Sequence, residues 1–246
     1  LLEKNNLVMY RLSFSNLLSA EQITSTDIAN LAWIADKYRQ SSHSQLLDTQ
    51  PCKGKILASL FFEPSTRTRF SFESSMLRLG GNVISLEQAN ASSISKGETL
   101  ADTGRMINNY ADIAVVRHNQ SGSSYELAKY AQIPVINGGD GDNQHPSQAL
   151  IDVYTILCLN TRLDNLKIAI VGDLKYSRTV RSLLNLLSKY HNNHIYLISH
   201  PDLALKSEEV TNLKNNGLTI TITTNLHNTI QDVDVLYSTR IQQERL

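Results

Sequence analysis

Eight short runs rich in apolar residues are spaced along the chain, and most are nearly continuous instead of alternating with polar residues. The first four read KILASLFF, NVISL, DIAVVRH and IPVIN, and the last four read KIAIVGD, HIYLIS, LTITIT and DVLYST. Continuous apolar runs of this length predict strands that are buried on both faces, as in parallel sheets covered by helices. We therefore expect eight strands.

Segments with helical periodicity lie between most of these runs, for example from Thr26 to Tyr38 and from Arg181 to Tyr190. Alternation of strand and helix predicts parallel sheets joined by right-handed crossovers. A long helical pattern from His145 to Asn160 is followed by the polar stretch NTRLDN, which indicates a seam. We predict an α/β fold of two domains, 1–148 and 149–246. Each is expected to hold a mostly parallel sheet of four to five strands with helices on both faces, with the active-site cleft between the domains.

Composition narrows the class of protein. The 246 residues are 41% hydrophobic and 19% charged, which is typical of a soluble globular protein. Lys plus Arg and Asp plus Glu both number 23, so no overall field attracts nucleic acid or an anionic membrane, and an anion site has to be local. Cys52 and Cys158 have no disulfide or metal spacing, which favours a reducing, cytoplasmic location. No apolar run approaches the roughly 18 residues of a membrane span.

A dense cluster of hydroxyls and arginines, Ser65 to Arg69, follows the first predicted strand. Pro64 and Ser65 are typical of a helix start. The free N–H groups of a first helical turn, two hydroxyls and Arg67 would then face one concavity, which suits a phosphate. Arg69 is expected to point elsewhere. The alternative is a capped helix with surface arginines.

Polar residues also follow the other predicted strands, including Arg117, the stretch GGDGDNQHPSQ and Arg240. In open α/β sheets ligands bind beyond the carboxyl ends of the strands, so these groups are expected to converge. Pro146 suits the first position of a helix, which places His145 at its N-terminus and Gln148 one turn later. The helix dipole disfavours a protonated imidazole there, so a neutral His145 could donate to a carbonyl oxygen. The alternative is that His145 only caps the helix.

Motifs for other chemistries are missing from the sequence. It contains no GxxxxGK[ST], and GDLKYS has one glycine where a dinucleotide fingerprint needs three. His191 and His194 have metal-like spacing but no third ligand, and they favour a solvated turn. We expect no cofactor and no metal.

The motifs taken together resemble a known family. PSTRTRFSFE, KGETLADT, VVRH, GDGDNQHPSQALID, GDLKYSRTVRS and STRIQQER occur in the order found in the catalytic chains of aspartate carbamoyltransferases. The STRTR and HPxQ motifs are shared with ornithine carbamoyltransferases. Glu63, Lys96 and Arg178 are similar to the aspartate enzyme.

The resemblance implies the transfer of a carbamoyl group from carbamoyl phosphate to L-aspartate, in pyrimidine biosynthesis. It implies two substrate-binding domains, 1–148 for carbamoyl phosphate and 149–246 for aspartate. The phosphate would be bound by Ser65, Thr66, Arg67 and Thr68. Arg117, Thr68 and His145 would polarise the carbonyl oxygen, and Gln148 would hold the carbamoyl nitrogen, so that Arg67, Thr68, Arg117 and His145 form the catalytic group.

The resemblance also implies a homotrimer with shared active sites, possibly with a separate regulatory subunit and allosteric control. Lys96 and a serine, Ser92 in preference to Ser93, would come from the neighbouring subunit. The aspartate carboxylates would be bound by Lys96, Arg178, Arg240 and Gln242. An ornithine acceptor is disfavoured by Arg178 and Arg240, and a non-catalytic homologue that binds carbamoyl phosphate is a further alternative.

Chains of this family continue past the position of Leu246, with an HPLPR-like segment and a last helix. Since the earlier motif positions are intact, we expect residues to be missing from the end of the sequence. Because the first residue is not Met, we expect residues to be missing from its start as well.

Overall fold

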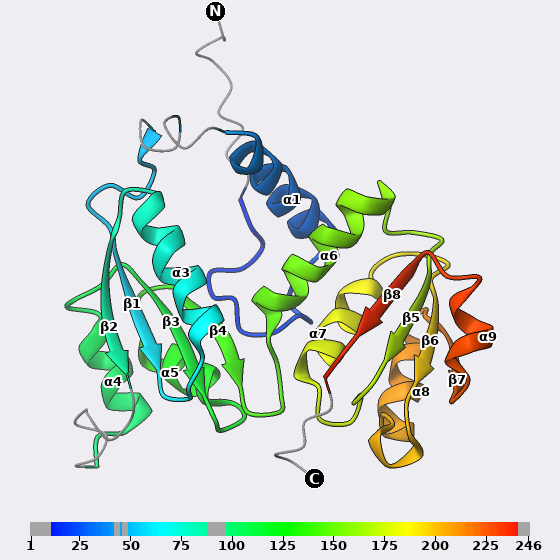
Figure 1. Cartoon of the computed structure of the whole chain (residues 1–246). Helices are drawn as coiled ribbons and strands as arrows, with labels where there is room; N and C mark the ends of the chain where they lie inside the picture. The colour runs from blue at the N-terminus through cyan, green and yellow to red at the C-terminus, as the bar shows by residue number, and fades with distance from the viewer. Residues whose placement is uncertain (1–10, 42–44, 46–48, 88–96, 241–246) are drawn as a thin grey trace, which may run out of the picture.

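The computed structural model describes residues 11–41, 45, 49–87 and 97–240. These residues form two parallel sheets that lie on either side of α6 (Pro146–Asn160), as Figure 1 shows. The two-sheet α/β class predicted from the sequence is therefore confirmed.

The first sheet has the strand order β2-β1-β3-β4, and every neighbouring pair is parallel. The strands are β1 (Ile56–Phe61), β2 (Asn82–Glu87), β3 (Ile113–His118) and β4 (Val135–Asp140). The helices that follow the first three of them are α3 (Thr66–Arg78), α4 (Leu100–Ile107) and α5 (Ser123–Tyr130).

Side-chain alternation along β1 builds a layer on each face of this sheet. Leu57 and Phe61 pack with Met76 of α3, whereas Ala58 and Leu60 pack with helices α4 and α5 on the other face. Continuous apolar strands are thus explained by burial between two helical layers.

The second sheet has the order β7-β6-β5-β8 and is also parallel throughout. Its strands are β5 (Lys167–Val171), β6 (His194–Ile198), β7 (Thr219–Thr223) and β8 (Val235–Ser238). The connecting helices are α7 (Arg178–Leu187), the 3₁₀ helix η3 (Pro201–Leu203), α8 (Ser207–Asn215) and α9 (Leu226–Ile230).

Burial of the strands differs from the expectation at the edges of the second sheet. β7 and β8 are its outer strands, and Ile222 and Leu236 are largely exposed on them. Burial on both faces therefore holds for the central strands β1, β3 and β5 but is wrong for β7 and β8. An edge strand pairs on one side only and has fewer neighbours to cover it.

The segment before β1 connects the two halves. Leu17 forms a parallel bridge to Ile136 of β4, whereas Ala20 and Ile23 pack into the core that surrounds the second sheet. Helix α1 (Ser25–Gln40) begins with a capping box between Thr24 and Asp27. The predicted division at residues 148 and 149 falls within the continuous helix α6, and it stays a prediction.

Among the described helices, none combines the length and the apolar character that a transmembrane segment requires.

Candidate active site

A cavity of about 1000 Å³ opens between the two sheets, at the carboxyl ends of their strands. Its polar lining comes from the starts of α3, α6 and α7 and from the ends of β3 and β8. The lining residues that the sequence singled out are Ser65, Thr66, Arg67, Thr68, Arg117, His145, Gln148, Arg178 and Arg240. Separate segments thus bring their donors into one hollow.

The start of α3 presents donors to this cavity. Ser65 is the N-cap residue, but its side chain makes no capping hydrogen bond. Thr66, Arg67 and Thr68 follow it in the cavity lining, where the first-turn N–H groups have no partners within the helix. The Ser65 hydroxyl therefore does not cap the helix, but the alternative of surface arginines is not contradicted, because Arg67 is exposed. Arg69 lies outside the lining, as predicted, with its Nε 3.7 Å from Glu73 of the same helix.

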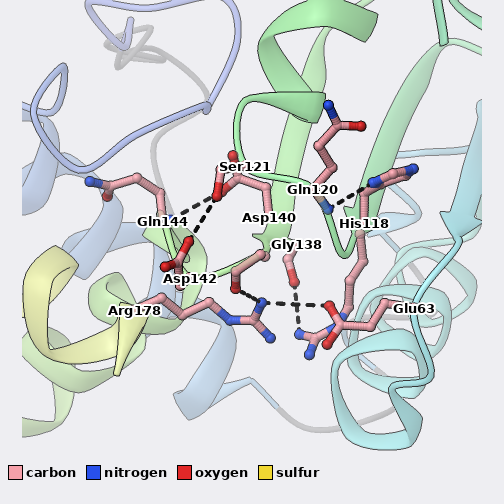
Figure 2. A network of polar contacts seen from close by, with 12 residues as sticks. Glu63, His118, Gln120, Ser121, Gly138, Asp140, Asp142, Gln144 and Arg178 are labelled. Carbon is pink, nitrogen blue, oxygen red and sulfur yellow. Dashed lines mark hydrogen bonds and ion pairs between the residues drawn. The ribbon is translucent and has the colours of Figure 1, made fainter. Parts of the chain in front are cut away.

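Two arginines, the buried Arg117 and the partly buried Arg178, are held by backbone carbonyls. Arg117 Nη1 donates to the Gly138 oxygen at 3.1 Å, and Arg178 Nη1 donates to the Gly141 oxygen. Glu63 Oε2 lies 3.6 Å from Arg117 Nε and 3.5 Å from Arg178 Nη1. Figure 2 shows Glu63 and Arg178 reaching toward each other across this network. Since Arg117 belongs to β3 and Arg178 to α7, Glu63 links the two halves of the protein.

The close approach of the arginines depends on a glycine. Gly139 has φ +116°, and a Cβ there would lie 3.0 Å from Arg117 Nη1 and 3.2 Å from Arg178 Cζ. The Gly139 N–H donates to Asn137 Oδ1 at 2.8 Å, which fixes this turn at the end of β4. The register between β3 and β4 also shifts here, between Val116 and His118. A side chain at position 139 would displace one of the guanidiniums.

His145 is the N-cap residue of α6, and its imidazole makes no capping hydrogen bond. Its backbone N–H donates to Ser182 Oγ at 3.1 Å, and its Nδ1 lies 3.3 Å from Ser147 Oγ. The side chain is only 5% exposed. The alternative that His145 only caps the helix is therefore wrong.

The electrostatic surroundings of His145 keep the imidazole neutral. Burial lowers its pKa to about 3, and the nearby charges of Arg117 and Arg178 act in the same direction. The predicted neutral state is supported by this shift, but the physical cause is burial and two cations, whereas the sequence argument used the helix dipole. A neutral ring can donate through one nitrogen and accept through the other.

Several predicted site residues lie outside the described residues, namely Ser92, Lys96 and Gln242. Sequence reasoning missed other lining residues, among them Ser147, Thr179 and Tyr237. Each lies within two or three residues of a predicted site residue, so proximity in the sequence was the available signal. Glu63 was noted only as a mark of resemblance, and its bridging position could not be derived from the motif.

The described residues include no group of three or more His, Cys, Asp and Glu side chains suited to a metal ion.

Two domain families match nearly all of the chain. The aspartate/ornithine carbamoyltransferase carbamoyl-P binding domain matches residues 15–157, and the Asp/Orn binding domain of the same enzymes matches residues 164–245. The chain belongs to the aspartate/ornithine carbamoyltransferase family. The resemblance inferred from the motifs is thereby confirmed.

Relatives within this carbamoyltransferase family are similar in sequence and in structure. The aspartate carbamoyltransferase catalytic subunit of Clostridium kluyveri is 50% identical over 194 residues, and the match covers 79% of this chain. The chain spans 63% of the length of that relative.

Solved structures show the same arrangement of elements. The catalytic subunit of Methanocaldococcus jannaschii aspartate transcarbamoylase superimposes with a TM-score of 0.83 at 45% identity, covering 95% of this chain and 76% of the other. Aspartate transcarbamoylase from Trypanosoma cruzi in complex with carbamoyl phosphate gives 0.85 at 37% identity, with 94% and 73% covered.

Proposed function

We propose that this carbamoyltransferase transfers the carbamoyl group of carbamoyl phosphate to the amino group of L-aspartate, as part of pyrimidine biosynthesis. The observation that carries the proposal is a single cavity that gathers the start of α3, Arg117 and His145 with Arg178 and Arg240. The first group suits a phosphate and a carbonyl oxygen, and the second suits carboxylates. The names of the similar proteins support the same activity.

Carbamoyl phosphate would bind at the start of α3. Ser65, Thr66, Arg67 and Thr68 would contact the phosphate, where the positive end of the helix adds to the attraction. Each charge-assisted hydrogen bond contributes roughly 1.5–3 kcal/mol, so a few of them hold a small dianion without a metal ion. Arg117 would bridge the phosphate and the carbonyl oxygen.

The chemical step would be a direct attack. The aspartate amine adds to the carbamoyl carbon, charge grows on the carbonyl oxygen, and the C–O bond to phosphate then breaks as a proton passes from the amine to the leaving phosphate. Donors aimed at that oxygen usually stabilise the transition state of such a reaction more than any other group. Thr68, Arg117 and neutral His145 would serve as these donors. For His145, a Ser147 hydroxyl that donates to Nδ1 leaves the imidazole proton on Nε2.

Aspartate would bind through Arg178 and Arg240, together with Gln242 and a neighbouring subunit's Lys96. Two arginines in the lining favour an acceptor with two carboxylates over a cationic one such as ornithine. Direct placement of both substrates adds a proximity effect.

The active assembly would be a cytoplasmic homotrimer, alone or with a regulatory subunit, in which Ser92 and Lys96 complete the neighbouring site. Phe70 and Leu77 support an interface, because they are 54% and 57% exposed on α3, beside the cavity. Residues 1–148 and 149–246 would be the domains for carbamoyl phosphate and aspartate.

The test is product formation by the full-length protein supplied with carbamoyl phosphate and either aspartate or ornithine. We expect carbamoyl aspartate and no citrulline. Arg67→Ala should lower kcat by about 10²–10³, because one donor to the developing charge is lost. Arg39→Ala, which removes an exposed arginine from α1, is the control and should retain full activity. Citrulline as the only product, or an inactive protein that still binds carbamoyl phosphate, would refute the proposal.

A further inference from the structure

Behind the cavity lies a carboxylate that touches two of its lining residues. Asp152 is part of α6 and does not itself line the cavity. Its Oδ1 accepts a hydrogen bond from Gln148 Nε2 at 3.0 Å, and its Oδ2 accepts one from the Tyr237 hydroxyl at 3.1 Å. Asp152 therefore holds one side chain on its own helix and one on β8.

The bond to Asp152 decides which end of the Gln148 amide faces the ligand. A glutamine amide has a donor end and an acceptor end of nearly the same shape, so the hydrogen-bond network sets its orientation. Gln148 and Asp152 are four residues apart on one helix, which brings their side chains together. Because the carboxylate accepts from Nε2, the acceptor Oε1 is left for the cavity.

Tyr237 keeps this carboxylate in place. Burial, together with the Asp152 charge, raises the pKa of Tyr237, so its hydroxyl remains a donor. Burial raises the pKa of Asp152, and the bonds from Gln148 and Tyr237 oppose that rise. Tyr237 also packs against the core of the second sheet, so the position of Asp152 is tied to that half of the protein.

We propose that Asp152 is a positioning residue that orients Gln148 as an acceptor for the NH₂ of the transferred group and so selects carbamoyl over acyl phosphates. The inference rests on the proposed function, since it assigns the ligand contact to Gln148. Its chemistry is separate from phosphate binding at α3, because an acceptor recognises the NH₂ group and ignores the phosphate. A ligand with CH₃ in place of NH₂ leaves Oε1 without a partner.

The test compares two stable phosphonates that differ only at this position. Phosphonoacetamide carries the NH₂ group, and phosphonoacetone carries CH₃. Calorimetric titration of the full-length protein should give about tenfold tighter binding of the amide, the value of one hydrogen bond. Asp152→Leu, which keeps the side-chain size but accepts no hydrogen bond, should remove this preference while phosphonoacetone binds as before.

Two further variants test the same inference if Asp152→Leu fails to fold. Asp152→Asn retains an oxygen that can accept from Gln148 Nε2, and it should restore most of the preference. Tyr237→Phe frees one end of the carboxylate, and it should lower the preference about threefold. If the folded Asp152→Leu variant keeps the full preference, or Tyr237→Phe has no effect on it, the inference is wrong. A wild-type protein that binds neither phosphonate would instead refute the proposed function.

Discussion

Replacing Gly139 with alanine tests whether Arg117 and Arg178 are arranged for anion binding. Gly139 has φ +116°, and its added Cβ would lie 3.0 Å from Arg117 Nη1 and 3.2 Å from Arg178 Cζ. Both distances are shorter than ordinary van der Waals contact, so a guanidinium has to move. We expect Gly139→Ala to weaken both the fold and the binding of an anionic ligand.

The two effects have different sizes and different origins. A residue with Cβ in this region of backbone conformation costs about 1–3 kcal/mol, which should appear in the free energy of unfolding. Displacement of one guanidinium removes a charge-assisted hydrogen bond to the ligand, worth roughly 1.5–3 kcal/mol. Since about 1.4 kcal/mol is tenfold in an equilibrium constant, affinity should fall about 10- to 150-fold.

Gly217→Ala is the matched control. Gly217 has φ +95°, but no atom lies within 4 Å of the Cβ that would be added. Urea unfolding should therefore show a comparable loss of stability in both variants. Calorimetric titration with phosphonoacetyl-L-aspartate, which carries a phosphonate and two carboxylates, should show weaker binding in Gly139→Ala alone. Equal affinity in the two variants would refute the argument.

Two other predictions concern the buried imidazole and the core. Because burial and two arginines lower the pKa of His145 to about 3, its ring nitrogens should show no titration between pH 5 and pH 8 by NMR, whereas the urea-unfolded chain should titrate near 6.5. The sign follows from linkage: below pH 6.5 the unfolded state takes up a proton that the folded state does not, so this group lowers stability by about 1.4 kcal/mol per pH unit down to its folded pKa. A midpoint above pH 5 in the folded protein would contradict this. Leu184→Ala in α7 should cost about 2–5 kcal/mol of unfolding free energy in urea, since Leu184 is fully buried, whereas Leu159→Ala, at a position 79% exposed on α6, should change it by less than about 0.5 kcal/mol. Equal losses of unfolding free energy in the two variants would contradict the assignment of Leu184 to the core.

Strand and helix positions were predictable because buried elements have recognisable patterns of apolar residues in the sequence. The run from Ile56 to Phe61 is apolar apart from Ser59, and β1 contacts helices on both faces. The helix that starts after Ser65 and the helix that starts at Pro146 were both predicted from local residues, and both begin there. The positions of this strand and of the two helix starts depend on residues that are close together in the sequence.

Contacts between distant segments were not predictable from the pattern. Nothing near Glu63 in the sequence indicates that its carboxylate would lie between Arg117 and Arg178, because that position depends on the packing of α7 against the first half of the chain. The exposure of Leu236 likewise depends on the place of β8 at the edge of its sheet. The polar clusters were predicted to converge, but the carboxylates that order them were not.

Glu63 explains how two cations stay close together before an anion binds. Because a Cβ at Gly139 would lie 3.0 Å from Arg117 Nη1 and 3.2 Å from Arg178 Cζ, these two atoms are at most about 6 Å apart, where repulsion is on the order of 3 kcal/mol or more at an effective dielectric constant of about 20. At 3.6 Å and 3.5 Å, the attraction of Glu63 to each of them is roughly 4 kcal/mol on the same scale, and it outweighs the repulsion. Both distances exceed the 2.7–2.9 Å of a charge-assisted hydrogen bond, so these two contacts of Glu63 Oε2 act through charge. Glu63 and the backbone carbonyls therefore hold both arginines in place, which lowers the cost of ordering two long side chains when an anion binds.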